Sequence, residues 1–246
     1  SPSTAATSQP RAAPPPKTLA PEQATVASGW KAGKTTVDQR RMLDRTLVDA
    51  ITLPAGPRFL ARLGHVRAAL GAVGSDGKRV VAEQLLAKLP ARSPEERGRM
   101  LAIATAVGAK TPALTDALLK DAITSGDARL ALELVHDGAS LSKSQKLELA
   151  PHLLSDEVLL SADSTKSLAR AAISVLADQP NALERFARSL TSPAVLFSEA
   201  LANRDQANAR ALAPLVGLLS PKEAKGLARL HPRSAIAAEL RARAGA

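Results

Sequence analysis

Two short motifs contain residue types that could perform catalysis or bind a phosphate. Ser140 and Lys143 form an S-x-x-K pattern, which on a helix places a lysine one turn from a serine and lets it accept the hydroxyl proton. Catalysts that use this pattern also need S-D-N and K-T-G segments, and the sequence contains neither. Ser142 and Gln145 instead form a helix-capping box at the same place. We therefore expect no catalysis here.

The segment 28–35, SGWKAGKT, nearly matches a phosphate-binding loop, which requires Gly, four residues and then Gly-Lys-Ser/Thr. Ser28 stands where the first glycine belongs, and its Cβ would obstruct the backbone N–H groups that wrap a phosphate. No strand pattern precedes the segment, and no hydrophobic run ending in Asp supplies a second magnesium ligand. We interpret it as a glycine-flanked hinge before the first helix.

Cysteine and histidine give no local signal for a metal site. The chain has no cysteine, which excludes disulfides, thiol catalysis and thiolate metal sites. None of its four histidines shows the pairwise spacing of a zinc motif: His65, His136, His152 and His231. We therefore expect no catalytic residue, no metal and no cofactor, and interpret the protein as non-enzymatic.

The composition favours an all-helical protein. Alanine and leucine account for 87 of the 246 residues, whereas valine and isoleucine together account for 18. Alanine and leucine are strong helix formers, and strands favour β-branched and aromatic residues. With four aromatic residues, we expect closely packed helices around a thin core. The longest apolar stretch, 101–109, is far shorter than the roughly 20 residues of a membrane span, so none is expected.

Apolar residues from residue 36 onward recur at helical spacing. Leu43, Leu47 and Ile51 lie four residues apart on one stripe. Three further stripes have the same character: Phe59, Leu63, Val66 and Leu70; Leu183, Phe186, Ala187 and Leu190; and Leu212, Leu215, Val216 and Leu219. Pro214 precedes most of the last stripe and is expected to kink that helix or delay its start.

Start and stop signals divide this region into short helices. Serine followed three residues later by Glu or Gln marks helix starts at Ser93, Ser142 and Ser220. Glycine is expected to end helices at residues 74, 77, 108 and 138. About fourteen helices are predicted, starting near residues 36, 57, 78, 94, 112, 127, 142, 156, 164, 181, 193, 206, 221 and 232.

The spacing of these starts favours a helical-repeat-like array. Pairs of helices recur at roughly 30 residues, which is within the range of known helical repeats. We therefore expect an all-α fold, namely an irregular α-superhelix, with a compact multi-helix bundle as the alternative.

Residues 1–35 differ in composition and are predicted to be a flexible Pro/Ala/Ser-rich arm. Residues 1–23 include six prolines and no large apolar residue except Leu19. Such a segment buries too little surface to offset its ordering entropy, and its prolines favour polyproline II. The chain thus divides into this arm and a helical domain, 36–246. Because the chain begins at Ser1, we also expect a leader or a larger upstream part.

Trp30, the only tryptophan, lies at the end of the arm beside Lys31 and Lys34. A tryptophan in a flexible segment can anchor in a partner's pocket. The alternative is that it folds back onto the first helix, because large apolar groups are usually covered. Under the first interpretation, Trp30, Lys31 and Lys34 are partner-binding candidates.

The formal net charge of +10 is unevenly distributed. Residues 58–110 contain ten Lys/Arg and four Asp/Glu, residues 111–183 contain six and ten, and residues 222–246 contain six and two. Two basic ends therefore flank an acidic middle. This asymmetry favours partners with an acidic surface.

One predicted helix presents a basic face. Arg58, Arg62 and His65 lie at offsets 0, 4 and 7, opposite the apolar stripe that begins at Phe59. Arg97 and Arg99 lie nearby in the sequence. We add the members of this group to the partner-binding candidates: Arg58, Arg62, His65, Arg97 and Arg99.

The absence of a catalytic constellation and the expected helical array indicate a protein-protein interaction scaffold. The alternative is a nucleic-acid-binding protein that uses its basic N- and C-terminal faces, because arginine and lysine neutralise phosphates. A Pro-rich arm before an Ala-rich helical body resembles translocated effectors of bacterial secretion systems, and is similar to periplasmic domains tethered by Pro-rich linkers. This resemblance implies a bacterial protein that is secreted or periplasmic rather than cytoplasmic.

Overall fold

The computed structural model describes residues 37–54, 56–71, 75–90, 92–155, 158–159, 161–162 and 166–245. These residues form helices and turns and no strand, which confirms the predicted all-α class. The predicted arm lies outside the described residues. The helices, in chain order, are α2 (Val37–Thr52), α3 (Pro57–Gly71), α4 (Ser75–Lys88), α5 (Pro94–Val107), α6 (Pro112–Thr124), α7 (Ala128–His136), α8 (Lys143–Leu149), η1 (Ala150–Leu154), α10 (Lys166–Leu176), α11 (Pro180–Ser189), α12 (Ala194–Ala202), α13 (Gln206–Leu212), η2 (Ala213–Leu218), α14 (Pro221–Leu230) and α15 (Ala237–Ala244).

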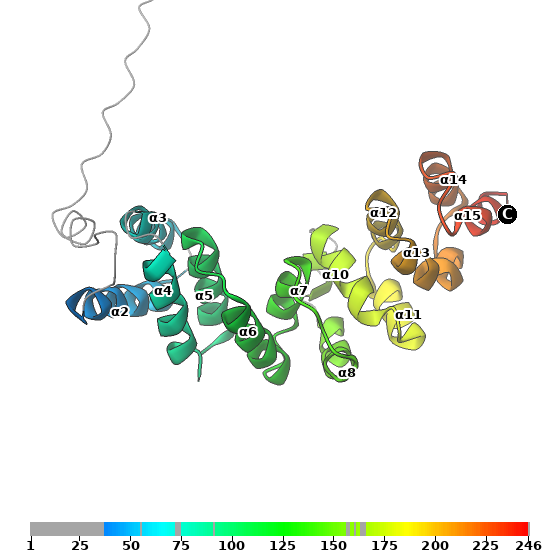
Figure 1. The fold of residues 1–246 in the computed structure, drawn as a ribbon. Coiled ribbons are helices and arrows are strands. Elements are labelled where there is room, and N and C mark those ends of the chain that lie inside the picture. Colours follow the sequence, from blue (N-terminus) through cyan, green and yellow to red (C-terminus); the bar gives the residue numbers. More distant parts are fainter. Residues whose placement is uncertain are drawn as a thin grey trace, which may run out of the picture.

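Alternate helices form two layers along an elongated, bowed body (Figure 1). In the inner layer of the bow, α3, α5, α7, α10, α12 and α14 contact one another in that order. In the outer layer, contacts run from α2 through α4, α6 and α8, and then through η1, α11 and η2 to α15. Within the inner layer, contacts are sparse between α5 and α7 and between α12 and α14. Both cavities described below lie at these two positions.

The predicted capping boxes are present. At Ser93, Ser142 and Ser220 the serine hydroxyl accepts from the backbone N–H three residues later, and that residue's side chain accepts from the serine backbone N–H. Each box satisfies two donors that have no partner inside the helix. The local sequence alone is therefore sufficient to place these helix starts.

Glycine ends helices where the backbone must adopt a left-handed conformation. Gly108 and Gly138 have φ values of 66° and 102°, which confirms these two predicted ends. Gly126 follows α6 in the same way, with a φ of 72°. The prediction at Gly77 was wrong: α4 starts at Ser75 and continues through it, because Asp76 in the first turn and Val80, Val81 and Leu85 on the buried side support a helix there. Residue 74 lies outside the described residues.

Two proline-based expectations had different outcomes. Pro214 does interrupt the helix pattern, since α13 ends at Leu212 and a 3-10 turn follows. The predicted helix start near residue 232 was wrong, because the last helix begins at Ala237. Residues 231–236 form turns instead, with the Ser234 N–H donating to the His231 carbonyl at 3.1 Å. No serine, threonine or acid before Pro232 caps a helix there.

The core follows the predicted stripes. Of the fifteen stripe residues all are buried except Leu63, which is partly buried against the core. Phe186 and Phe197 are the largest fully buried side chains, and the rest of the core is mainly leucine and alanine. Small side chains let the layers approach closely, so the core is thin. None of the helices in the described part has the length and apolar character that a bilayer crossing requires.

Candidate functional site

The basic face of α3 is only partly available to a partner. Arg58 is exposed, and the guanidinium of Arg62 lies 3.8 Å from the carboxylate of Asp49 on α2. His65 is half-buried. The three side chains share one helix, as predicted, but Arg62 also contributes to the contact between α2 and α3.

Of the two arginine candidates on α5, Arg97 is buried and Arg99 is partly buried, and both bind groups on other helices. The Arg97 side chain is 5% exposed, and its Nη1 donates to the carboxylate of Asp121 at 2.7 Å. Its Nε lies 3.6 Å from the carboxylate of Asp127. Arg99 donates its Nε to the backbone carbonyl of Ile51, at the end of α2. Both arginines join helices because α5 packs between α2 and the α6–α7 turn.

The remaining sequence candidates are either outside the described residues or exposed. Trp30, Lys31 and Lys34 lie outside the described residues, as does the loop-like segment that contains them. Ser140 and Lys143 are exposed. Ser142 between them is the N-cap of α8, as expected.

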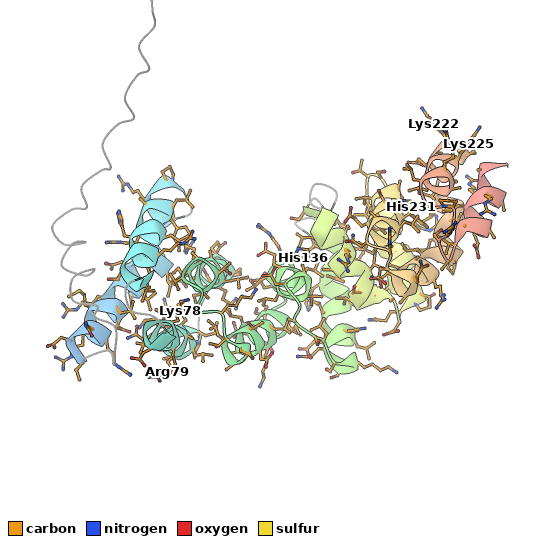
Figure 2. The ribbon with its side chains drawn as sticks, turned by 45° about the horizontal axis from the view of Figure 1, so that its top comes forward. Lys78, Arg79, His136, Lys222, Lys225 and His231 are labelled. Atoms are coloured by element: carbon orange, nitrogen blue, oxygen red, sulfur yellow. The ribbon has the colours of Figure 1, made fainter. Side chains whose placement is uncertain are left out.

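Cations without ion pairs gather instead at the C-terminal end. Lys222, Lys225 and Arg229 lie on one side of α14, at offsets 0, 3 and 7, and all are exposed. Figure 2 shows Lys222 and Lys225 extending away from the body. In the part of the chain that the structure describes, none of the three makes a salt bridge. This helix therefore presents an uncompensated basic stripe.

A groove of about 600 Å³ opens on the inner layer between α5 and α7; we call it the central groove. Gly98, Ala102 and Ala106 line it from α5 at intervals of four residues, so they lie on one side of that helix. A Cβ built on Gly98 meets no atom within 4 Å, so this wall is open. Leu101 and Leu168 add apolar surface.

The opposite wall of the central groove is charged. Arg129, Glu133 and His136 come from α7 and are followed by Asp137; His136 is labelled in Figure 2. The Nε atom of Arg129 lies 3.3 Å from the carboxylate of Glu133, and the Nζ atom of Lys110 lies 2.6 Å from the carboxylate of Asp137. Burial raises the pKa of Glu133, although Arg129 opposes this effect. The groove thus combines a small-residue wall with a wall of both charge signs.

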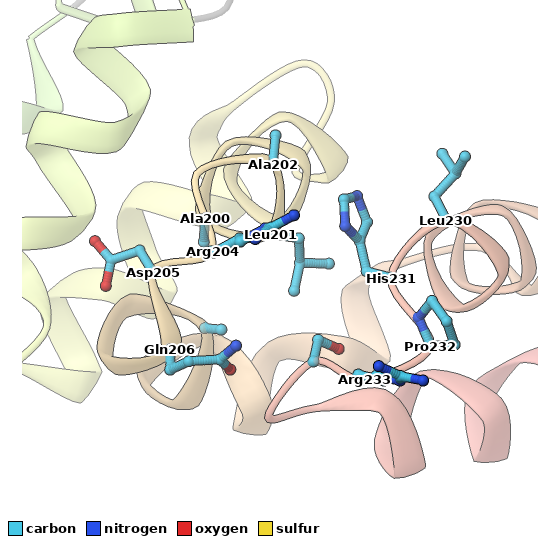
Figure 3. Close-up of a pocket in the computed structure, with 12 residues that line it drawn as sticks. Ala200, Leu201, Ala202, Arg204, Asp205, Gln206, Leu230, His231, Pro232 and Arg233 are labelled. Atoms are coloured by element: carbon cyan, nitrogen blue, oxygen red, sulfur yellow. The ribbon is translucent and has the colours of Figure 1, made fainter.

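A second cavity, of about 560 Å³, lies between the α12–α13 turn and the link from α14 to α15; we call it the C-terminal cavity. Arg204 and Gln206 line one side, and His231 and Arg233 line the other (Figure 3). The turn has Arg204 in a left-handed conformation with a φ of 53°, the only positive φ of a non-glycine residue among those described. Leu230, at the rim, is 75% exposed.

The sequence contains a signal for the turn at Arg204, although not for the cavity that this turn lines. Ser125-Gly126-Asp127 and Asn203-Arg204-Asp205 both end one helix and cap the next. Arg204 therefore replaces the glycine that such a turn favours. His231, Arg233 and Leu230 could not have been assigned to the same place, because only packing brings the two turns together.

Comparison with known proteins gives no relative for this chain: no protein-family model, curated protein or solved structure matches it.

Proposed function

We propose that the chain is a non-enzymatic helical scaffold that binds another protein, and that its helices form an irregular α-superhelix. The two-layer order supports this proposal, because each helix contacts helices that lie within a few elements of it along the chain, and the body is elongated rather than compact (Figure 1). Stacked helices of this kind build extended inner surfaces that suit protein partners.

The central groove is the observation on which the proposal depends. Gly98, Ala102 and Ala106 allow the backbone of a partner segment to approach α5, while Leu101 and Leu168 supply apolar contact. Arg129 and Glu133 can fix orientation by pairing with charges on that segment. An amphipathic helix laid into an apolar groove is a common mode of peptide recognition.

Site-specific photocrosslinking tests this proposal. A benzoylphenylalanine probe at Thr105, an exposed groove residue, should crosslink a protein partner from an extract of the source cells. The same probe at Thr124, an exposed residue of α6 outside the groove, serves as the control. Ala106→Trp, which fills the groove, should abolish the crosslink, whereas Ala113→Trp at an exposed position of α6 should leave it unchanged.

The groove assignment fails if both probes crosslink the same proteins equally, or if Ala106→Trp has no effect. Repeating the crosslinking with and without residues 1–35 also shows whether the arm, with Trp30, Lys31 and Lys34, takes part in binding. Arg58 and Arg62 are tested by the same crosslinking experiment after substitution of each with glutamine.

The basic stripe of α14 supports nucleic-acid binding as a second candidate function. Lys222, Lys225 and Arg229 would contact phosphates, and the affinity would then fall steeply as salt increases. The test measures the affinity of the full chain for a nucleic-acid duplex between 50 and 200 mM salt. Over this range the affinity should fall by roughly tenfold for each few phosphates contacted. An affinity that does not depend on salt, or that is unchanged in Arg229→Gln, eliminates this alternative.

A further inference from the structure

The C-terminal cavity collects cationic and hydrogen-bonding side chains from two turns, and we propose that it is a binding site for a phosphate monoester. Arg204 comes from the α12–α13 turn, and His231 and Arg233 come from the link before α15 (Figure 3). The two turns are held together, because Gln206 Oε1 accepts from the backbone N–H of Ala235 at 2.8 Å. The site is separate from the central groove and goes beyond the scaffold function.

The cavity has a net positive charge. The side chains of Arg204 and Arg233 form no hydrogen bond or ion pair with any described residue, and both residues are exposed. Asp205 is the acidic residue of the lining, but its carboxylate accepts from the backbone N–H of Asn208 at 3.1 Å and from its side-chain amide at 2.9 Å. Figure 3 shows the Asp205 side chain directed away from His231 and Arg233. The two guanidinium groups therefore lack an internal counterion.

The backbone at Arg204 gives an independent reason to assign a role to its side chain. The Arg204 N–H donates to the Leu201 carbonyl and the Asp205 N–H to the Ala200 carbonyl, a pattern repeated at three other helix ends. Those ends have glycine at the equivalent position: Gly108, Gly126 and Gly138. An L side chain is strained in this conformation, and such strain concentrates at functional sites. At this one end the chain keeps a guanidinium despite the strain.

A hydroxyl beside the cavity also lacks a partner. Ser234 lines the cavity, and its Oγ is buried without a hydrogen-bond partner among the described residues. Unpaired buried polar atoms are rare in proteins because they lose water without replacing it. An oxyanion ligand supplies the acceptor that this hydroxyl lacks.

The number and kind of donors select the ligand class. A phosphate monoester carries a charge of about −1.5 to −2 near pH 7 and has three acceptor oxygens, which matches two guanidinium groups together with an imidazole and a hydroxyl. A volume of about 560 Å³ exceeds that of a bare phosphate and leaves space for the group to which it is esterified. Leu201 and Leu230 provide apolar contact for that group.

Isothermal titration calorimetry of the full chain tests the proposal with three probes: inorganic phosphate, glycerol 3-phosphate and a phosphoserine peptide. We expect glycerol 3-phosphate or the peptide to bind, and Arg204→Gly and Arg233→Gln each to weaken that binding by about tenfold or more. Arg210→Gln removes the same charge from an exposed position of α13 that is not part of the lining, and should change the affinity by less than about twofold.

The arms of the experiment separate the outcomes. Tighter binding of the peptide assigns the phosphate to a modified protein, and tighter binding of glycerol 3-phosphate assigns it to a small metabolite. Arg204→Gly also relieves backbone strain, so lost binding together with a raised melting temperature excludes misfolding as the cause. The proposal is overturned if no ester binds at 1 mM, or if Arg210→Gln weakens binding as much as Arg204→Gly, since the attraction would then be diffuse.

Discussion

The side-chain carbonyl of Gln206 accepts a hydrogen bond from the backbone N–H of Ala235 at 2.8 Å. This contact joins the first residue of α13 to the link before α15, across the C-terminal cavity. This hydrogen bond therefore adds a direct link between the two turns that helix packing brings together at the cavity.

Gln206→Ala should loosen this link. We expect a loss of about 1 kcal/mol in the free energy of unfolding, because one hydrogen bond to a backbone donor is removed. Hydrogen exchange at the Ala235 amide should become faster, while exchange in α5 should not change. Asn181→Ala, at an exposed position without this contact, should alter stability by less than about 0.5 kcal/mol. Unchanged protection of the Ala235 amide would contradict the assigned role of Gln206.

Arg204→Gly should stabilise the fold. A left-handed conformation costs an L residue about 1–2 kcal/mol, and the extra freedom of glycine in the unfolded chain offsets about 0.5–1 kcal/mol of the gain. The expected net increase in unfolding free energy is thus about 0.5–1 kcal/mol, measured by urea denaturation. The reverse substitution, Gly138→Arg, is made at a position where a Cβ meets no atom within 4 Å. It should lower the free energy of unfolding by a similar amount. Equal stabilities of wild type and Arg204→Gly would show that the turn is unstrained.

Asp121→Ala should be more damaging than removal of an exposed acid from the same helix. Arg97 is buried, so the variant leaves its guanidinium with Asp127 alone, 3.6 Å away. We expect a loss of about 2–3 kcal/mol in unfolding free energy. Asp116→Ala, at an exposed position of α6, should cost less than about 0.5 kcal/mol. Similar losses in the two variants would mean that the Arg97 pair contributes little.

Glu133→Gln should stabilise the protein at neutral pH. Burial raises the pKa of Glu133 in the folded state, so its ionised form disfavours folding. The destabilisation is absent well below the ordinary glutamate pKa and develops as the pH rises through and above it. At pH 7 we expect a gain of about 0.5 kcal/mol in the variant, reduced by solvent screening because the side chain is only partly buried. Chemical denaturation between pH 3.5 and 7 measures it.

Glu223→Gln provides a control of opposite sign. Hydrogen bonds from the Ser220 hydroxyl and backbone N–H lower the pKa of Glu223. Its ionised form therefore stabilises the fold above the ordinary glutamate pKa, and this contribution is lost as the pH falls. The two variants should diverge from wild type in opposite directions as the pH rises. If both lose stability at pH 7, the assigned direction for Glu133 is wrong.

Local sequence determined the helices and their buried sides. The capping boxes at Ser93, Ser142 and Ser220 act within four residues, so the chain needs no distant partner to form them. The apolar stripe with Phe186 is likewise a matter of helical periodicity. The incorrect prediction of a helix start near residue 232 also has a local cause. Proline is compatible with the first position of a helix, but it does not supply the side-chain cap that is missing there.

Tertiary structure alone decided which charges are used internally and which remain free. Arg97 is exposed or buried according to how α5 packs against the α6–α7 turn, and helical spacing carries no information about that packing. Arg204 and Arg233 line the same cavity because two turns that are far apart in the sequence pack against each other. Sequence periodicity predicts the side of a helix that is buried, whereas the pairing of charges depends on distances between helices.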